Sequence, residues 1–236
     1  MAHERTIGGG VTDATHPTPH IKILPNGPYR VTGAPLVRMR PIYNSEGDGV
    51  EWVRGVEVDH SDPVDLCRCG RSRNLPFCDG SEAEAAFDGT EVADRRPSAD
   101  RRRNCAELGP VQLTDDRTLC AHAAFCQKTP TNVWQMARGY QDPETQQTII
   151  EMVRRCPSGR LQYYIAPETT PEEEELRQEV GLVENGPLWV RGGIPVEGAD
   201  GFEYEVRNRM TLCRCGQSDN KPYCDGSHWD SGFKDS

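Results

Sequence analysis

Near the middle of the chain, apolar residues recur with the period of a helix. The members of this pattern are Ile149, Met152, Val153 and Cys156, spaced i, i+3, i+4 and i+7. Such spacing places one apolar stripe on a helix. The preceding Asp142-Pro143-Glu144 supplies a capping residue, a proline for the first turn and an acidic side chain. We therefore predict an amphipathic helix that carries Cys156 at its C-terminal end.

Three further stretches indicate other elements. Phe202, Tyr204 and Val206 alternate with glutamates, and residues 160–165 are largely apolar, so both stretches are predicted to be strands. Thr170-Pro171-Glu172-Glu173 has the chemistry of a helix start. We expect that helix to end at Gly181.

The chain also contains an internal repeat. The matching segments are 26–33 with 185–192, 66–70 with 212–216, and 76–81 with 222–227. Each copy opens with a turn and continues as a short strand, and Trp52 to Val58 occupies the place of the strand predicted at residues 202–206. Gly27 and Cys67 lie 40 residues apart but Gly186 and Cys213 only 27. The 13 extra residues of the first copy predict a longer loop around residues 43–49.

Composition limits the classes of protein that fit. Hydrophobic residues make up 35% of the 236 residues, so the core is thin and small modules need metal centres as additional support. A formal charge of −10 argues against nucleic acid or an anionic membrane surface as a partner. The first twenty residues are polar, without the apolar core of a signal peptide. We expect a flexible arm there and a cytoplasmic protein that does not enter a membrane.

Four metal-binding side chains lie within sixteen residues near the C-terminus: Cys213, Cys215, Cys224 and His228. Thiolates and imidazole select zinc or iron–sulfur centres over hard cations. The pattern, which also includes Ser218, Pro222, Asp225, Gly226 and Ser227, resembles the CDGSH iron–sulfur family. The resemblance implies a [2Fe–2S] cluster on three cysteines and one histidine. A histidine ligand would titrate near neutral pH and so couple electron uptake to proton uptake.

The first copy of the repeat has Cys67, Cys69 and Cys78 but places Glu82 where the family has histidine. Three alternatives are open. Glu82 is the fourth ligand, or His60 takes the place of Glu82 as that ligand, or the site is degenerate and holds its metal weakly. If Glu82 ligates, its negative charge lowers the reduction potential relative to imidazole. With two sites of this kind, the resemblance implies two [2Fe–2S] clusters.

A third cysteine set lies between the copies: Cys120, Cys126 and Cys156. Its C-x5-C spacing and C-P-S-G ending resemble divergent single-cluster ferredoxins, with Ala123 in the place of one ligand. The resemblance implies a [3Fe–4S] cluster, or a [4Fe–4S] cluster whose labile iron takes His122 or water. Cys105 is either a small buried hydrophobe at a strand edge or a fourth ligand.

The resulting architecture is α+β, with two β-rich CDGSH modules that form a pseudo-dimer within a monomeric chain and a ferredoxin-like domain between them. We assign residues 1–20 to the arm, 21–92 to the first module, 93–170 to the central domain, and 171–236 to a linker helix and the second module. The basic run at 94–103 is predicted to be a linker or a solvated face, with docking of an acidic partner as the alternative.

No catalytic triad, phosphate loop or dinucleotide fingerprint is visible, so we do not expect a free-standing enzyme. The leading hypothesis is an electron-transfer protein that works between a reductase and an acceptor. Storage or transfer of clusters, or redox sensing, is the alternative. A structural zinc protein is the third hypothesis.

Overall fold

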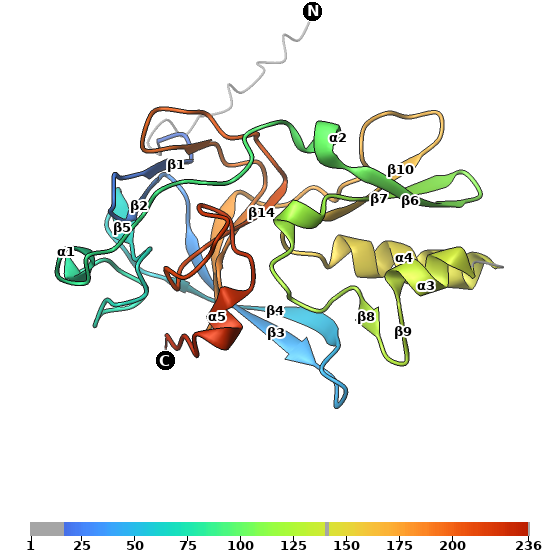
Figure 1. Ribbon diagram of the computed structural model, residues 1–236, viewed down its shortest axis with the longest axis horizontal. Coiled ribbons are helices and arrows are strands. Elements are labelled where there is room, and N and C mark those ends of the chain that lie inside the picture. The colour runs from blue at the N-terminus through green and yellow to red at the C-terminus, as the bar shows by residue number, and fades with distance from the viewer. Residues whose placement is uncertain (1–16, 140–141, 236) are drawn as a thin grey trace, which may run out of the picture.

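The computed structural model describes residues 17–139 and 142–235. The two copies of the repeat lie side by side, and most of the segment between them forms a separate lobe on the right in Figure 1. The predicted arm falls largely on residues 1–16, outside the described residues, and His20 already pairs in the first strand. No helix in the described ranges is long and apolar enough to cross a membrane.

The two copies of the repeat each build a sheet. The first sheet has the order β13-β1-β2-β5, with bounds Val196–Glu197, His20–Ile23, Tyr29–Thr32 and Val64–Leu66. The second has the order β14-β12-β11-β3-β4, with bounds Arg209–Leu212, Leu188–Arg191, Glu179–Val183, Leu36–Tyr43 and Gly49–Val58.

Each sheet includes strands of the other copy: the first contains β13, and the second contains the β3–β4 hairpin. Strand β13 of the second copy pairs in parallel with β1 of the first, with Ile21 opposite Val196. Strand β3 of the first copy pairs in parallel with β11 of the second, with Gly181 opposite Val37. Buried residues from both copies, such as Tyr29 and Leu212, then form one hydrophobic cluster. The copies therefore fold around a common core.

The central domain packs two helices on a three-stranded sheet of order β10-β7-β6. The strands are Leu161–Ile165, Val111–Asp115 and Arg103–Leu108, and the helices are α3 (Val133–Arg138) and α4 (Pro143–Arg154). A two-stranded sheet, β8 (Gln127–Lys128) and β9 (Thr131–Asn132), precedes α3. The predicted helix is confirmed: Asp142 caps α4 by accepting a hydrogen bond from the Thr145 amide, and Ile149, Met152 and Val153 are buried.

The linker helix predicted from residue 171 is wrong. Residues 171–177 are irregular, and β11 follows from Glu179. The Glu173 carboxylate does not cap a helix, because it accepts hydrogen bonds from the Arg209 guanidinium at 2.7 and 2.8 Å. Gly181 lies inside β11, where a Cβ atom would approach Met39 Cγ to 2.7 Å. Long-range contacts have therefore overridden the local helix signal.

The strand predicted at residues 202–206 is reduced to a single bridge between Glu197 and Glu203. The apolar positions Phe202 and Tyr204 are explained by packing of their rings, which meet edge to face at 5.1 Å. The equivalent stretch of the first copy forms a full hairpin, β3 with β4. The extra residues of the first copy therefore lengthen this hairpin on both sides of its tip.

Candidate metal centres

The second copy gathers its four predicted ligands into two pairs. Cys213 and Cys215 follow β14, and a bridge between Leu212 and Tyr223 brings Cys224 back beside them. The sulfur atoms of Cys213 and Cys215 are 3.8 Å apart. Helix α5 (Ser227–Asp230) places the His228 Nδ1 atom 3.4 Å from the Cys224 sulfur.

The other residues of the motif hold the loop. The Ser218 hydroxyl donates to the Tyr223 carbonyl at 2.7 Å and accepts from the Asn220 amide at 3.0 Å. The Asp225 carboxylate accepts from the Asp219 amide and from Ser227. These bonds fix the backbone around the ligands, which explains why serine and aspartate accompany the cysteines in the motif.

The first copy repeats this geometry. The sulfur atoms of Cys67 and Cys69 are 3.7 Å apart, and the Cys78 sulfur is 3.2 Å from the Glu82 carboxylate. Glu82 thus occupies the place of His228. The His60 ring instead hydrogen-bonds to the neighbouring Ser61 carbonyl at 2.7 Å. Of the two alternatives for the fourth ligand, the structure brings Glu82 to the cysteines.

The pairs fit a centre of two metal ions. Two thiolates on one tetrahedral ion, each at about 2.3 Å, lie roughly 3.8 Å apart, which agrees with the observed sulfur separations. Within residues 17–139 and 142–235, no three or more Cys, His, Asp or Glu side chains converge on a single ion. A [2Fe–2S] cluster takes two ligands on each iron, so the donor pairs of both copies suit it.

Burial controls the protonation of these ligands. It raises the pKa of Cys78 to about 12 and that of Cys69 to about 11, so metal binding must displace protons from the thiols. Burial, and next the charge of Arg214, lower the pKa of His228 to about 4. The expected titration near neutral pH is shifted downward, and the ring is neutral at pH 7, which is the form that binds a metal.

The central domain brings Cys120, Cys126 and Cys156 to the lining of one cavity. Cys156 follows the end of α4 directly, as predicted. The Arg160 guanidinium donates to the Cys120 sulfur at 3.0 Å, and burial raises the pKa of Cys126 to about 11. Three thiols beside a cation form a donor set that suits an anionic cluster.

Ala123 and His122 also line this cavity, and both His122 and Ala124 adopt positive φ angles, of 55° and 59°. His122 is exposed and lies against the second copy, because a Cβ atom on Gly226 would approach its ring carbons to 2.9 Å. Cys105 lies on the edge strand β6 with its thiol near the Arg103 carbonyl, outside the residues that line the cavity.

One part of the central site was not foreseen from the sequence: the β3–β4 hairpin of the first copy clamps the cysteine loop. The Asp48 carboxylate accepts from the amide and hydroxyl of Thr129 at 2.7 and 2.9 Å. The Gly49 amide donates to the Ala124 carbonyl at 3.2 Å. The Trp52 ring stacks on Phe125 at 4.7 Å. The 13 extra residues of the first copy are the sequence feature that could have indicated this contact.

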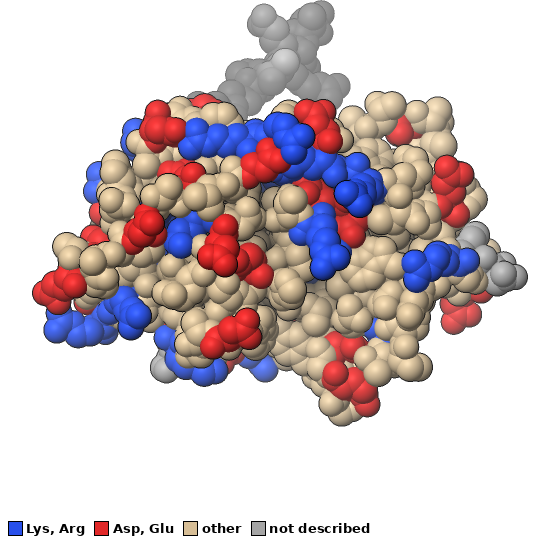
Figure 2. Space-filling model, in the orientation of Figure 1, with Lys and Arg blue, Asp and Glu red and all other residues tan. Residues whose placement is uncertain are grey.

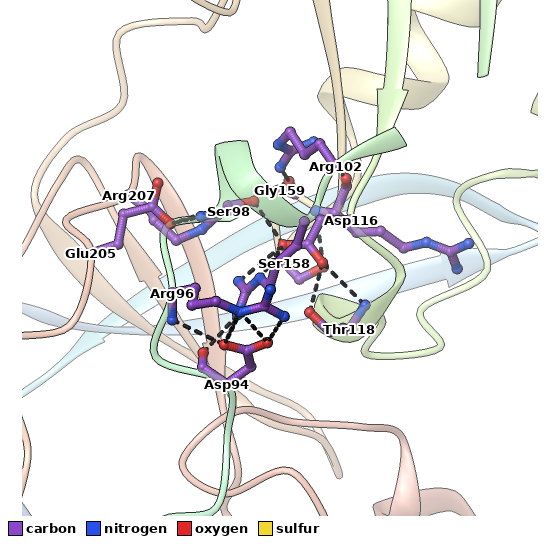
Figure 3. Close-up of polar contacts among 12 residues, drawn as sticks. Asp94, Arg96, Ser98, Arg102, Asp116, Thr118, Ser158, Gly159, Glu205 and Arg207 are labelled. Atoms are coloured by element: carbon purple, nitrogen blue, oxygen red, sulfur yellow. Dashed lines mark hydrogen bonds and ion pairs between the residues drawn. The ribbon is translucent and has the colours of Figure 1, made fainter. Parts of the chain in front are cut away.

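A polar network joins the central domain to the second copy (Figure 3). Helix α2 (Ser98–Arg101) contributes Arg101, which pairs with the fully buried Asp116 at 3.0 Å. Arg102 and Arg207 both donate to the Gly159 carbonyl. The run at 94–103 is therefore more than a solvated linker.

On the surface, Lys and Arg side chains along the upper edge of the molecule are interspersed with Asp and Glu (Figure 2). In the basic run, Arg95 pairs with Asp200 and Arg96 with Asp94. Arg95 and Arg96 therefore already have carboxylate partners within the chain.

Arg209 of the second copy forms hydrogen bonds beside a predicted ligand of the central centre. Strand β14 carries it, and its guanidinium donates to the carbonyls of Val153, Arg154 and Cys156 at 2.8–3.1 Å. These carbonyls lie at or just beyond the C-terminal end of α4, where a cation is favourable. Arg209 therefore positions Cys156 while lying only four residues from Cys213.

We expect Asp116→Asn to destabilise this junction by about 2 kcal/mol, because a buried charged hydrogen-bonding group is lost. Burial raises the pKa of Asp116, but bonds from Thr118, Ser98 and Arg101 outweigh it and hold the pKa below its usual value. Its stabilisation is thus present above the unfolded pKa and lost as pH falls through the lower, folded one. Thermal unfolding at a series of pH values should show the two proteins converging below about pH 4. A constant difference would contradict this assignment.

An arginine lies between the two paired cysteines in each copy, and the two arginines differ in whether a carboxylate neutralises them. Arg214 pairs with the buried Asp235 at 2.6 Å. Arg68 is only 2% exposed and donates to the Gly89 carbonyl, but its Nε and one terminal nitrogen have no partner within the described residues. A buried cation that forms no ion pair among the described residues therefore accompanies the site that has Glu82 in place of histidine.

Comparison with known families agrees with this division. Residues 26–81 and 185–229 match the family described as iron-binding zinc finger, CDGSH type. Residues 108–166 match the family described as divergent 4Fe-4S mono-cluster. No curated protein and no solved structure matches the chain. The matches support an iron–sulfur protein, in the arrangement expected from the motifs.

Proposed function

Because the chain carries two CDGSH-type iron-binding modules on either side of a divergent mono-cluster domain, we propose that it is an electron-transfer protein with three iron–sulfur centres. Two are [2Fe–2S] centres on the paired ligands, and the third is a [3Fe–4S] or [4Fe–4S] centre in the central domain. When bound, such clusters accept and release single electrons. The protein would act between a reductase and an acceptor, without an enzymatic reaction of its own.

The observation that carries the proposal is the direct contact between ligand loops of neighbouring centres. A Cβ atom on Gly70 would lie 2.5 Å from the Cys215 carbonyl, and one on Gly216 would lie 2.5 Å from the Cys69 carbonyl. This reciprocal approach, with the exchanged strands, supports a pseudo-dimer of the two modules. Contact between the loops suits transfer of electrons from one centre to the other. A protein that only stored clusters would not need such contact.

The chain's own residues would hold the centres and exclude water. Cys67 and Cys69, like Cys213 and Cys215, are buried, and the Ser72 and Ser218 hydroxyls fix their loops. In the central domain, Arg160 would balance thiolate charge at Cys120. Rigid, dry ligand loops limit rearrangement when the charge of a centre changes.

A second function, transfer of a cluster to another protein, is favoured by one feature of the first module. Cys78 and Glu82 are only partly buried, whereas Cys224 and His228 are buried. A partly exposed centre with a carboxylate ligand gives up metal more readily. Incubation with an apo-ferredoxin acceptor separates the two functions, because a cluster donor loses iron to it and an electron carrier does not.

The proposal is tested by anaerobic absorption and EPR spectra of the oxidised and reduced protein, with iron, zinc and sulfide measured on the same sample. We expect a coloured protein with about seven or eight irons per chain and [2Fe–2S] signals on reduction. A [3Fe–4S] signal in the oxidised protein would identify the central centre. A colourless zinc protein would exclude both iron-based functions.

A further inference from the structure

In the second module, the central domain covers the ligand face formed by Cys224, Gly226 and His228. The His122 ring packs against Gly226, and the Asn220 side-chain amide donates to the Thr118 carbonyl at 2.7 Å. Cys224 is 3% exposed and His228 5% exposed. Burial is the main cause that raises the pKa of Cys224, and Cys120 of the central domain also contributes. The central centre is thus adjacent to the second module.

Nothing in the described part of the chain covers the equivalent face of the first module. Gly80, the counterpart of Gly226, has no atom of residues 17–139 or 142–235 within 4 Å of an added Cβ. Asn74, the counterpart of Asn220, is exposed, and Cys78 and Glu82 are partly exposed. Four matched positions therefore differ in the same way between the two modules, although the loops around them have the same hydrogen bonds.

The contacts set an order for the three sites. The second module touches the central domain through His122 and Gly226, and it touches the first module through the loops at Gly70 and Gly216. The ligand loop of the second module therefore lies between the central site and the ligand loop of the first module, although the β3–β4 hairpin of the first module also contacts the central domain. Among the described residues, the ligand face of the first module ends this series and is open to solvent.

We propose that this face, defined by Asn74, Cys78, Gly80 and Glu82, is the docking surface for an external single-cluster iron–sulfur protein. The proposal rests on the electron-transfer function proposed above. The occupant is inferred from the chain itself, because a single-cluster domain occupies the equivalent face of the second module with a loop over its glycine. Each encounter moves one electron from the reduced partner to the protein, and no bond is formed or broken.

The test measures reduction of the full-length, cluster-loaded protein by stopped flow, with reduced plant-type [2Fe–2S] ferredoxin as the protein donor and dithionite as the small donor. Asn74→Trp should lower the second-order rate constant with ferredoxin at least tenfold and change the dithionite rate less than twofold. Asn104→Trp makes the same substitution at an exposed position of β6 in the central domain and should change neither rate. Asn74→Arg is a second variant with another side chain, and iron content verifies that each variant is loaded.

Rapid-freeze EPR adds a second readout. In the wild type, the signal of the first module should appear before the others. A Gln127→Trp variant tests the competing entry point, because Gln127 lines a neighbouring pocket that shares Cys120 and Cys126 with the central cavity. If it slows ferredoxin while Asn74→Trp does not, the proposal is overturned although electron transfer stands. If dithionite reduces no centre in any variant, the proposed function itself fails.

Discussion

Replacement of Arg68 by methionine is expected to lower the reduction potential of the first centre by on the order of 100 mV, the effect of one nearby unit charge in a partly screened site. A positive charge favours the reduced, more negative state of a cluster, so its removal lowers the potential. Methionine retains an apolar stem against Tyr29 and Phe87, whose rings lie 5.6 and 5.3 Å from the guanidinium carbon. The fold should therefore tolerate the change.

The reason lies in the charge balance of the two modules. The first has an anionic fourth ligand candidate, Glu82, and a buried Arg68 without a carboxylate partner in the described residues. The second has a neutral His228 and an Arg214 already neutralised by Asp235. Glu82 with Arg68, and Arg214 with Asp235, thus each form a set without net charge, although Arg38 also lies 3.7 Å from Asp235. Arg68 would offset the lowering of potential expected from Glu82 alone, and the two centres should lie closer in potential than their ligands imply.

A matched control tests this balance. The double variant Arg214→Met with Asp235→Asn removes one charge of each sign from the second module and should shift the potential of its centre far less. Redox titrations followed by EPR give both potentials. Equal shifts in Arg68→Met and in the double variant would show that packing, and not charge, sets the potential.

The sequence predicted what depends on neighbours along the chain. Ligands within sixteen residues, such as Cys213 and His228, must lie in one loop, and Asp142 with Ile149 predicts α4 because both signals belong to the same helix. The repeat also predicted two similar loops, and the structure shows the same hydrogen bonds in both.

The errors have a common physical cause. At Glu173 the local capping signal is weaker than the bonds from Arg209, 36 residues later, and at Tyr204 ring packing produced an alternation without a full strand. Exchange of β3 and β13 between the copies depends on pairing across more than 140 residues. Composition and spacing carry no information about such partners.

The hairpin clamp gives the largest expected loss. We expect Trp52→Ala to remove the central centre selectively, since Trp52 is the main contact between the hairpin and the cysteine loop. Its ring stacks on Phe125 and its Nε1 atom donates to the Arg155 carbonyl at 2.9 Å. These contacts hold both the loop of Cys126 and the chain beside Cys156. Replacing a fully buried tryptophan by alanine costs about 3–5 kcal/mol, and the partly buried Trp52 should cost somewhat less. That cost falls on a centre that has Ala123 in place of one ligand.

The measurement is iron content and EPR of the purified variant. Trp52→Ala should lose about three or four irons per chain and the signal of the central centre while it keeps the [2Fe–2S] signals of both modules. Trp52→Phe retains stacking but not the hydrogen bond and should lose less. Val56→Ala, on the same strand but 73% exposed, serves as the matched control and should lose none. If Trp52→Ala retains the central signal, the hairpin is not a clamp. If all three signals vanish together, its role is to hold the whole fold, because the same ring also lies 4.7 Å from Trp189 of the second module.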